Sequence, residues 1–505
     1  MGELGRSGVS AVKWSAVSTA VRFVLQLAAQ VVLARTLGPD VYGVFAIGTV
    51  VLTFANFVSS FGFSWSLLQR NVLHEEDVRF AFTWQVIVGL LTMAALYLSA
   101  PALATYFNEP RAKAVIEWLS LASLLAAAAS PSGYMMQRDL NFRAVGLIQI
   151  GSYAVGYLAV GVPMALSGWG VDALVAAWLV QAAVMLVANF AVRPHSLRPL
   201  LWYADAAHAV GTGRAVFFTN IVNWFLNNID RIMIGRLLNA HALGLYNVAY
   251  NVATMPNTLL LGALQPAFLS AGARLQTDPQ RLGRAYHQMV AVVLVLVLPA
   301  FVFLSLVSSD LVRFLYGTRW TGAAWVLGLL FLSIPAYVWW GLSTPVLWNT
   351  GRKNHEFLLQ LPLLVLGTIG FYLFAGRGLH AAAAVTVALL FGRAVVIGFA
   401  ALRALRLSAI ALLPHALRGL LLSALCIATV RTAQYAVAQF TMPLLSLVAS
   451  GLAALTLLLL LLIFRPQILG QETAGMLLRF FPRLSNVLAR AGGASLSNGA
   501  GERGG

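Results

Sequence analysis

Two groups of polar side chains recur at helical spacing within otherwise apolar sequence. The first group is separated by steps of three or four residues and so lies along one helical face: Thr19, Arg22, Gln26 and Gln30. The second lies 201 positions further on, with Asn228 and Asp230 beside it: Asn220, Asn223, Asn227 and Arg231. Amides donate to and accept from sugar hydroxyls, and a guanidinium can donate two hydrogen bonds to one phosphate. The two groups therefore predict a binding site for a ligand with both hydroxyl and phosphate groups.

The elements that carry these groups must be membrane helices. Of the 505 residues, 60% are hydrophobic and 10% are charged, whereas a globular domain carries roughly 25% charged residues. We predict an all-α polytopic membrane protein with about 14 spans, each long enough to cross a hydrocarbon core of roughly 30 Å. The predicted spans are 12–34, 41–63, 80–103, 114–136, 144–166, 171–192, 215–238, 243–264, 289–307, 323–347, 357–375, 381–402, 416–438 and 444–464.

The net charge of +17 is distributed according to membrane topology. If both termini are cytoplasmic, 21 of the 33 Lys and Arg residues fall in or beside cytoplasmic segments, and seven fall on the other side. This bias follows the positive-inside rule, so we expect no nucleic-acid partner but an attraction to anionic membrane lipids. The single cysteine, Cys426, excludes an intramolecular disulfide and a cysteine metal cluster. Neither metal-ligand spacing nor a catalytic triad motif is present.

An internal repeat relates the two polar groups. At an offset of 201, residues 31–57 match residues 232–258 at six positions, which include Arg35/Arg236, Gly43/Gly244 and Asn56/Asn257. The offset maps spans one and two onto spans seven and eight, so the copies are parallel and a site is expected where the halves meet. We predict a six-helix lobe at 1–200, a second at 201–405, an additional helix pair at 406–465 and a cytoplasmic tail at 466–505, disordered at its end. Gly43 and Gly244 are interpreted as loop or N-terminal glycines, with close helix approach as the alternative.

Charged side chains at mid-membrane cost about 2.5–3.5 kcal/mol each, so they normally face a bundle interior or an aqueous cavity. We predict that Arg22 and Arg231 line such a cavity with the amide groups, and that Arg393 of span twelve joins them. The alternative is that the amides only join helices and that Asp230 forms a structural ion pair with Arg231 or Arg236. The other role open to Asp230 is a protonatable group that couples transport to an ion gradient.

Three segments resemble a known family. The segment IDRIMIGRLLNAHALGLYNVAYNV resembles the D-x(3)-IG-x(2)-L-x(4)-LG-x-Y-x(2)-A signature of polysaccharide transporters, with Asp230 as its acidic residue. LARTLGPDVYGVF and MQRDLNFR resemble two further elements of the same proteins. The chain is similar to the Wzx-like branch of the multidrug/oligosaccharidyl-lipid/polysaccharide (MOP) exporter superfamily. The resemblance implies two six-helix bundles around a V-shaped cavity that opens alternately to either side.

The function implied by this resemblance is flipping of undecaprenyl-pyrophosphate-linked oligosaccharide across the bacterial inner membrane, for lipopolysaccharide O-antigen, capsule or exopolysaccharide. We expect no cofactor. The resemblance implies coupling to a proton or sodium gradient. Polysaccharide polymerase and export machinery are possible partners. The alternatives are a peptidoglycan lipid-precursor flippase, a drug/cation antiporter, and a membrane polymerase or glycosyltransferase. An antiporter would need acidic cavity residues, and an enzyme would need a large external domain, which these short loops do not provide.

Overall fold

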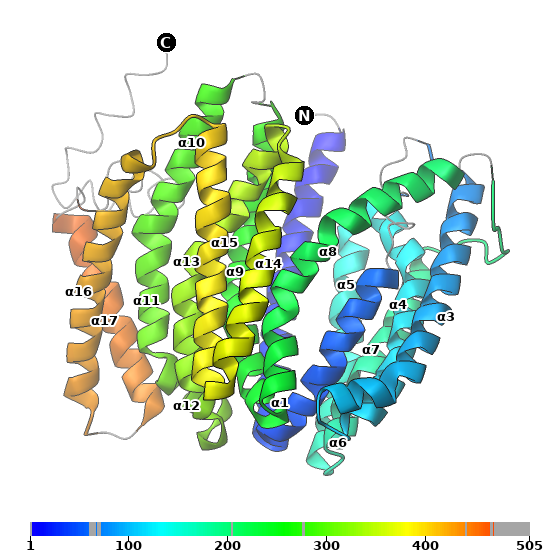
Figure 1. The fold of residues 1–505 in the computed structure, drawn as a ribbon, viewed down its shortest axis with the longest axis horizontal. Helices are drawn as coiled ribbons and strands as arrows, with labels where there is room; N and C mark the ends of the chain where they lie inside the picture. The colour runs from blue at the N-terminus through cyan, green and yellow to red at the C-terminus, as the bar shows by residue number, and fades with distance from the viewer. Residues whose placement is uncertain are drawn as a thin grey trace. The chain divides into compact units, whose positions relative to one another are not determined.

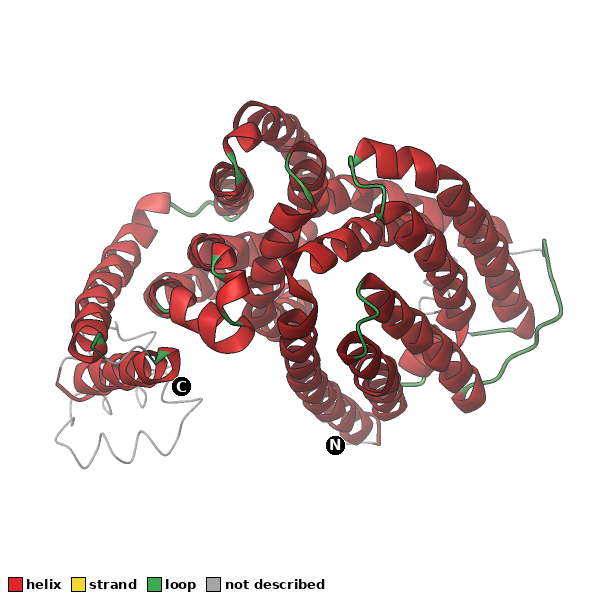
Figure 2. Ribbon diagram, turned by 90° about the horizontal axis from the view of Figure 1, so that it is seen from below, coloured by secondary structure: helices red, strands yellow, loops and turns green. Residues whose placement is uncertain are grey.

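The computed structural model describes residues 3–59, 67, 72–203, 206–274, 278–439, 442–464 and 468. Within these residues the chain is helical and contains no strand (Figure 2). The predicted tail at 466–505 lies almost wholly outside them.

The N-terminal elements are α1 (Glu3–Ser59), α3 (Glu75–Tyr106), α4 (Ala112–Arg138), α5 (Phe142–Tyr153), η1 (Ala154–Gly161), α6 (Val162–Leu166), α7 (Val171–Val192) and α8 (Ala206–Leu237) (Figure 1). The next are α9 (Ala240–Arg274), α10 (Pro279–Val292), η2 (Val293–Val297), α11 (Leu298–Leu306), α12 (Ser308–Tyr316), η3 (Thr318–Trp320) and α13 (Gly322–Asn349). The last are α14 (Lys353–Phe374), η4 (Ala375–Arg377), α15 (Leu379–Ala404), η5 (Ala409–Leu412), α16 (Leu413–Val437) and α17 (Pro443–Phe464).

Helix α1 contains the first predicted span and residues 41–59 of the second, joined at a break. Gly38 has φ 78° and ψ 174°, a backbone conformation that is open to glycine and unfavourable for other residues. Pro39 follows it and suits the first turn of the second segment, because its missing N–H would have no helical partner there. The chain can therefore reverse direction between the two segments without a loop.

The number of membrane helices is compatible with the prediction of about 14. Among the described residues, 11 helices are long and apolar enough to span a membrane. This set treats α1 as one helix and does not include α8 or α9, which hold the seventh and eighth predicted spans. The all-α polytopic membrane fold is confirmed.

Packing divides the chain into two compact units, Met1–Val248 with Leu366–Ala382, and Ala249–Val365 with Ala383–Gly505. The predicted lobe boundaries remain a prediction. In the first unit α4 packs against α1, α3, α5 and α7, and these helices lie side by side (Figure 1). Small residues allow the close approach, since a Cβ on Gly89 of α3 would lie 2.7 Å from the Cβ of Ala127.

In the second unit the two additional helices predicted from the sequence pack on each other and on their neighbours. Helix α16 contacts α17 and α11, and α11 contacts α13. Cys426 and Val430 of α16 are buried against Val307. The hydroxyl of Ser446, in α17, donates a 2.6 Å hydrogen bond to Asp310 of α12.

Gly43 and Gly244 are sites of close helix approach, which was the alternative interpretation; they are not turn glycines, although both lie near the N-terminal end of a helical segment. Both lie inside helices of the first unit. A Cβ on Gly43 would lie 1.7 Å from the carbonyl oxygen of Ala240, and a Cβ on Gly244 would lie 1.9 Å from that of Pro39. Ala240 is the repeat counterpart of Pro39, so the two copies make the same backbone contact reciprocally.

Candidate functional site

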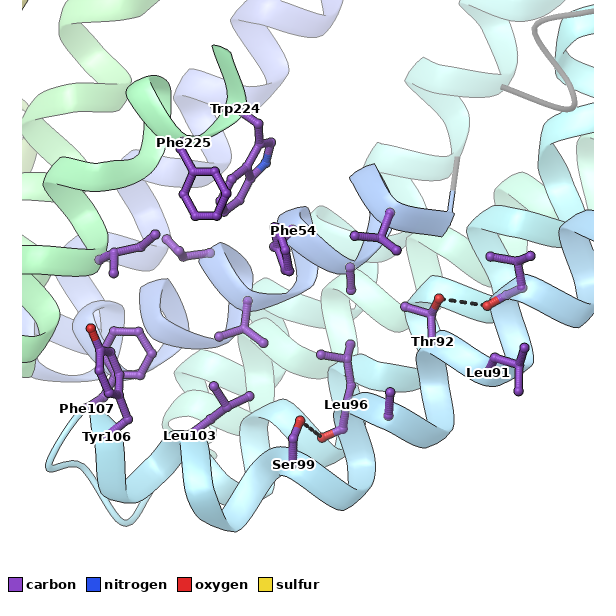
Figure 3. A pocket seen from close by; sticks show the side chains of 17 residues that line it. Phe54, Leu91, Thr92, Leu96, Ser99, Leu103, Tyr106, Phe107, Trp224 and Phe225 are labelled. Atoms are coloured by element: carbon purple, nitrogen blue, oxygen red, sulfur yellow. Dashed lines mark hydrogen bonds between the residues drawn. The ribbon is translucent and has the colours of Figure 1, made fainter. Parts of the chain in front are cut away.

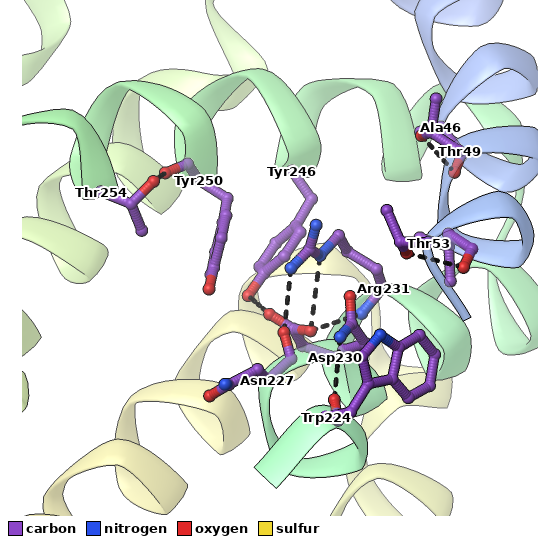
Figure 4. Close-up of polar contacts among 12 residues, drawn as sticks. Ala46, Thr49, Thr53, Trp224, Asn227, Asp230, Arg231, Tyr246, Tyr250 and Thr254 are labelled. Carbon is purple, nitrogen blue, oxygen red and sulfur yellow. Dashed lines mark hydrogen bonds and ion pairs between the residues drawn. The ribbon is translucent and has the colours of Figure 1, made fainter. Parts of the chain in front are cut away.

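A buried polar cluster occupies the ends of α8 and α9 that are joined to each other (Figure 4). The Asp230 side chain is 5% exposed and accepts a 2.5 Å hydrogen bond from the hydroxyl of Tyr246. Its other oxygen accepts from the Arg231 backbone N–H at 2.8 Å, and the Arg231 Nε lies 3.8 Å away. Arg231 also donates to the carbonyl of Asn227 at 2.9 Å. A buried carboxylate is stable here because a phenol, a backbone N–H and a cation surround it.

Arg22 of α1 faces α5. Its guanidinium donates a 2.8 Å hydrogen bond to the side-chain oxygen of Gln149. One helical turn from Arg22 lies Gln26, and one turn from Gln149 lies Tyr153; both line the same cavity of the first unit. Arg22 therefore lies next to this cavity. Its guanidinium is hydrogen-bonded to a neutral amide, which leaves the positive charge itself uncompensated in this contact.

The cavity beside Arg22 has a volume of about 470 Å³ and is enclosed by α1, α4, α5, η1 and α7. Its polar lining consists chiefly of amides and aromatic rings: Gln26, Asn56, Gln137, Gln181, Asn189, Tyr134, Tyr153, Tyr157 and Trp178. The volume falls within the range of roughly 300–1,000 Å³ typical of ligand pockets. We refer to it as the amide cavity.

Two features of the amide cavity prepare it for a polar ligand. The Asn56 side-chain oxygen is buried and has no hydrogen-bond partner within the part of the chain that the structure describes, so it is an acceptor available to a donor. Tyr153 and Tyr157 are stacked, with centroids 4.5 Å apart and planes 11° apart. Tyr157 lies in η1, a π-helical turn; such turns are frequent at functional sites. Amide dipoles and flat aromatic faces together suit a ring that carries hydroxyl groups.

The structure brings only part of the predicted site together. Gln26 lines the amide cavity and Arg22 adjoins it, while Gln30 has a buried side-chain nitrogen without a hydrogen-bond partner among the described residues. Asn223, Asn227 and Arg231 lie half-buried on α8 and are not in the cavity lining. The Asn220 side chain lies outside the described residues. The role predicted for each of these residues remains a prediction.

Arg393 lies in the second unit, in a network of its own. Its side chain is enclosed, at 1% exposure, with Nε donating to Gln360 at 2.9 Å and the guanidinium 3.7 Å above the Trp340 ring. Gln360 donates in turn to Glu356 at 3.1 Å. Glu356 also accepts from Thr344 at 3.0 Å and from the Trp348 indole at 2.7 Å. This arrangement holds a buried cation and a buried anion through shared hydrogen bonds.

Sequence reasoning missed most of the cavity lining because it comes from several helices. One signal was available: Gln149, Tyr153 and Tyr157 follow one another at steps of four, which places them on one helical face. Asn56 was noticed only as a repeat match with Asn257. Among the described residues, no cluster of His, Cys, Asp and Glu could hold a metal ion.

The fold matches that of solved membrane transporters. It resembles the lipid II flippase MurJ in an inward closed conformation with a TM-score of 0.73 at 14% identity, covering 90% of this chain and 99% of that one. It resembles an inward-facing multidrug resistance MATE family transporter of the MOP superfamily with a TM-score of 0.58 at 13% identity, covering 76% and 94%. The fold is therefore that of the MOP-superfamily transporters, which confirms the predicted multi-pass, all-α membrane fold.

The family follows from the sequence itself. The family model described as "Polysaccharide biosynthesis protein" matches residues 32–325, more than half of the chain. The chain belongs to this family, which confirms the predicted resemblance.

Three curated relatives are similar to the chain over much of its length. The lipopolysaccharide biosynthesis protein WzxC of Escherichia coli (strain K12) is 28% identical over 64% of this chain and 66% of its own. The teichuronic acid biosynthesis protein TuaB of Bacillus subtilis (strain 168) is 25% identical over 73% and 76%. The succinoglycan biosynthesis transport protein ExoT of Rhizobium meliloti (strain 1021) is 26% identical over 64% and 65%. The chain thus spans just under two thirds of WzxC and ExoT.

Proposed function

We propose that this chain flips a lipid-linked oligosaccharide across the bacterial inner membrane, with both termini cytoplasmic, for the assembly of a surface polysaccharide. The observation that carries the proposal is the amide cavity with Arg22 beside it. Amides and tyrosines contact the sugars, and Arg22 neutralises the pyrophosphate. The relatives named for lipopolysaccharide, teichuronic acid and succinoglycan biosynthesis support a polymer pathway as the setting. A polysaccharide polymerase and export machinery are the partners that such a pathway supplies.

Transport proceeds by alternating access in this proposal. The head group binds in the amide cavity while the hydrocarbon chain stays in the bilayer, and the protein then exposes the cavity to the other side. Binding energy can only shift the populations of the two states, so net movement against a gradient needs an ion gradient. Asp230 is the coupling candidate, because its carboxylate is buried and its hydrogen bond to Tyr246 would be altered by protonation or by cation binding.

The experiment is transbilayer movement of undecaprenyl-pyrophosphate-linked oligosaccharide in proteoliposomes. Wild type is compared with Arg22→Ala and Gln26→Ala at equal incorporation. The matched control is Arg198→Ala, which removes the same charge from an exposed position outside the helices. We expect both cavity variants to lose most of the transport and the control to retain it. Full activity of both cavity variants would reject the site, and no movement by wild type would reject the function.

A second function is supported by the fold alone. The likeness to a lipid II flippase makes a peptidoglycan precursor an alternative substrate. The same proteoliposomes, loaded with lipid II in place of the oligosaccharide lipid, decide between them. Preferential movement of lipid II would replace the proposed substrate, and movement of a small organic cation instead of either lipid would indicate a drug antiporter.

A further inference from the structure

A second cavity of the first unit differs from the amide cavity in its chemistry (Figure 3). It has a volume of about 790 Å³ and runs between the second segment of α1, α3 and α8. Its walls are aliphatic and aromatic side chains, among them Phe54, Leu96, Trp224 and Phe225. Leu91 and Tyr106, which also line it, are 64% and 44% exposed, so the cavity opens to the surroundings along one side. We call it the apolar groove.

The two small hydroxyl groups in the wall of the apolar groove are already hydrogen-bonded. The hydroxyl of Thr92 donates to the carbonyl of Val88 at 2.7 Å, and that of Ser99 donates to the carbonyl of Leu96 at 3.2 Å, as drawn in Figure 3. Neither hydroxyl therefore offers its proton to water. A buried water needs two to four polar partners, whereas a hydrocarbon needs none. The lining thus favours an aliphatic occupant.

The apolar groove follows the helix axis over a distance that matches a lipid chain. Leu91 and Tyr106 are fifteen residues apart on α3, which corresponds to roughly 22 Å at 1.5 Å per residue. One leaflet of the hydrocarbon core is roughly 15 Å thick. The groove therefore extends from the middle of the membrane to the end of α3 that carries Tyr106. In the proposed topology this is the periplasmic end.

A cation lies at that end of the groove. The guanidinium of Arg236, at the end of α8, lies 5.1 Å from the centroid of the Tyr106 ring. Within the part of the chain that the structure describes, Arg236 forms no ion pair with a carboxylate. An apolar channel that ends at an uncompensated arginine is complementary to an amphiphile with a hydrocarbon chain and an anionic phosphate.

We propose that the apolar groove binds the polyprenyl chain of the transported lipid after flipping, with its phosphate at Arg236. The inference rests on the proposed function and adds a binding site on the release side, separate from the amide cavity. A chain held there keeps the product next to the protein in the outer leaflet. The sugar leaves the amide cavity first, and the lipid leaves the groove afterwards.

The test uses the single native cysteine. In a Cys426→Ala background, Ser99→Cys places a thiol of nearly the same size in the groove, and Leu98→Cys places one at a position that is 78% exposed. Both variants are reconstituted into phosphatidylcholine nanodiscs, and the rate of maleimide labelling is measured with added polyprenyl phosphate or phosphatidylglycerol. We expect polyprenyl phosphate to slow labelling at position 99 several-fold, phosphatidylglycerol to have little effect, and labelling at position 98 to stay unchanged.

A charge variant tests the role of Arg236 at the Tyr106 end of the apolar groove. Arg236→Gln should raise the polyprenyl phosphate concentration needed for half protection about fivefold, the effect of roughly one favourable charge near the membrane surface. Arg319→Gln, an exposed arginine of η3 on the same predicted side, should leave it unchanged.

The outcomes separate this inference from the proposed function. Equal protection by phosphatidylglycerol would assign the groove to bulk lipid and overturn the inference. No protection by either lipid, in a protein that flips oligosaccharide lipid in proteoliposomes, would overturn it while the function stands. Selective protection in a protein that flips nothing would keep the groove and reject the function.

Discussion

The carboxylate of Asp40 and the imidazole of His241 lie 3.1 Å apart, and the two residues are separated by 201 positions, which is the offset of the internal repeat. Residues at equivalent positions of a repeat can touch only where the two copies meet near their symmetry axis. Gly43 and Gly244 contact Ala240 and Pro39 at the same place. These contacts locate the pseudo-twofold axis of the N-terminal segments of the two copies.

Substitution of either axial glycine should destabilise the protein. A Cβ at Gly43 or Gly244 would overlap a backbone carbonyl at less than 2 Å, which neither helix can relieve by a side-chain rotation. We expect Gly43→Ala and Gly244→Ala each to lower the free energy of unfolding by about 3 kcal/mol, at the upper end of the range for overpacking. Thermal unfolding in detergent measures this.

Gly151→Ala is the control for those variants. Gly151 is helical and a Cβ there would have no neighbour within 4 Å. The substitution should leave stability unchanged or raise it by about 0.5–1 kcal/mol, because alanine favours the helix. Equal stability of all three variants would contradict the close axial contact.

Asn56→Leu should separate stability from transport. The Asn56 side-chain oxygen is buried with no hydrogen-bond partner among the residues that the structure describes, and leaving such a group unsatisfied costs about 1–3 kcal/mol. An apolar residue of similar size should therefore hold or raise the unfolding temperature, while transport falls because the amide cavity loses an acceptor. Asn257→Leu removes a similarly unpaired buried oxygen in the second unit and should stabilise without loss of transport. A stable Asn56→Leu protein with full transport would remove Asn56 from the site.

The Glu356–Arg393 network should show energetic coupling. Arg393→Met leaves a buried anion without its cation, and Glu356→Gln leaves a buried cation without its anion, so each should destabilise by about 3 kcal/mol. The double variant should be less destabilised than the sum of the single variants, by about 1 kcal/mol or more. Thermal unfolding of wild type, the two single variants and the double variant measures the four stabilities of this double-mutant cycle. Strict additivity would mean that Gln360 does not transmit the interaction.

Asp230→Asn should dissociate folding from coupling. Asparagine keeps an oxygen for the Tyr246 hydroxyl, so the fold should persist, but it cannot change its charge. We expect the variant to retain downhill flipping and to lose stimulation by an imposed proton or sodium gradient. Tyr246→Phe, which removes the donor and leaves the carboxylate, should keep a gradient response. If Asp230→Asn responds to the gradient as wild type does, Asp230 is a structural residue.

Acid should lower the stability of the protein through His195, in the segment that follows α7. The ring of His195 lies 4.9 Å from Phe82 and 5.4 Å from Phe190, and burial lowers its pKa from the usual 6.5. The folded protein therefore keeps the ring neutral at a pH where the unfolded chain already binds a proton. Stability should fall as the pH drops below about 6.5, and His195→Phe should reduce this slope. Thermal melts between pH 5 and 8 measure it, and identical slopes would contradict the assignment.

The helical membrane fold could be predicted because the apolar runs and the basic loops are local properties of the sequence. Arg22 and Gln26 could be found because a stripe on one helix is visible as a spacing of four residues. Tyr153, Gln181 and Asn189 could not be assigned to the same cavity, because their meeting depends on how α5 and α7 pack against α1 and α4. Close approach at the axial glycines could not be preferred from the sequence for the same reason, because the contacts join residues 197 and 205 positions apart and no local pattern shows them.

The reciprocal glycine contact also constrains how such a chain could have arisen. Two separate copies of one half, arranged about a twofold axis, would have formed this contact as an isologous homodimer interface, in which each glycine meets the partner's equivalent backbone. A single substitution in such a dimer would have introduced two clashes at once. After duplication and fusion, each copy could vary independently along most of its length, but both glycines still face a carbonyl. The reciprocal contact in this one polypeptide is thus the contact that an isologous dimer of two such halves would make.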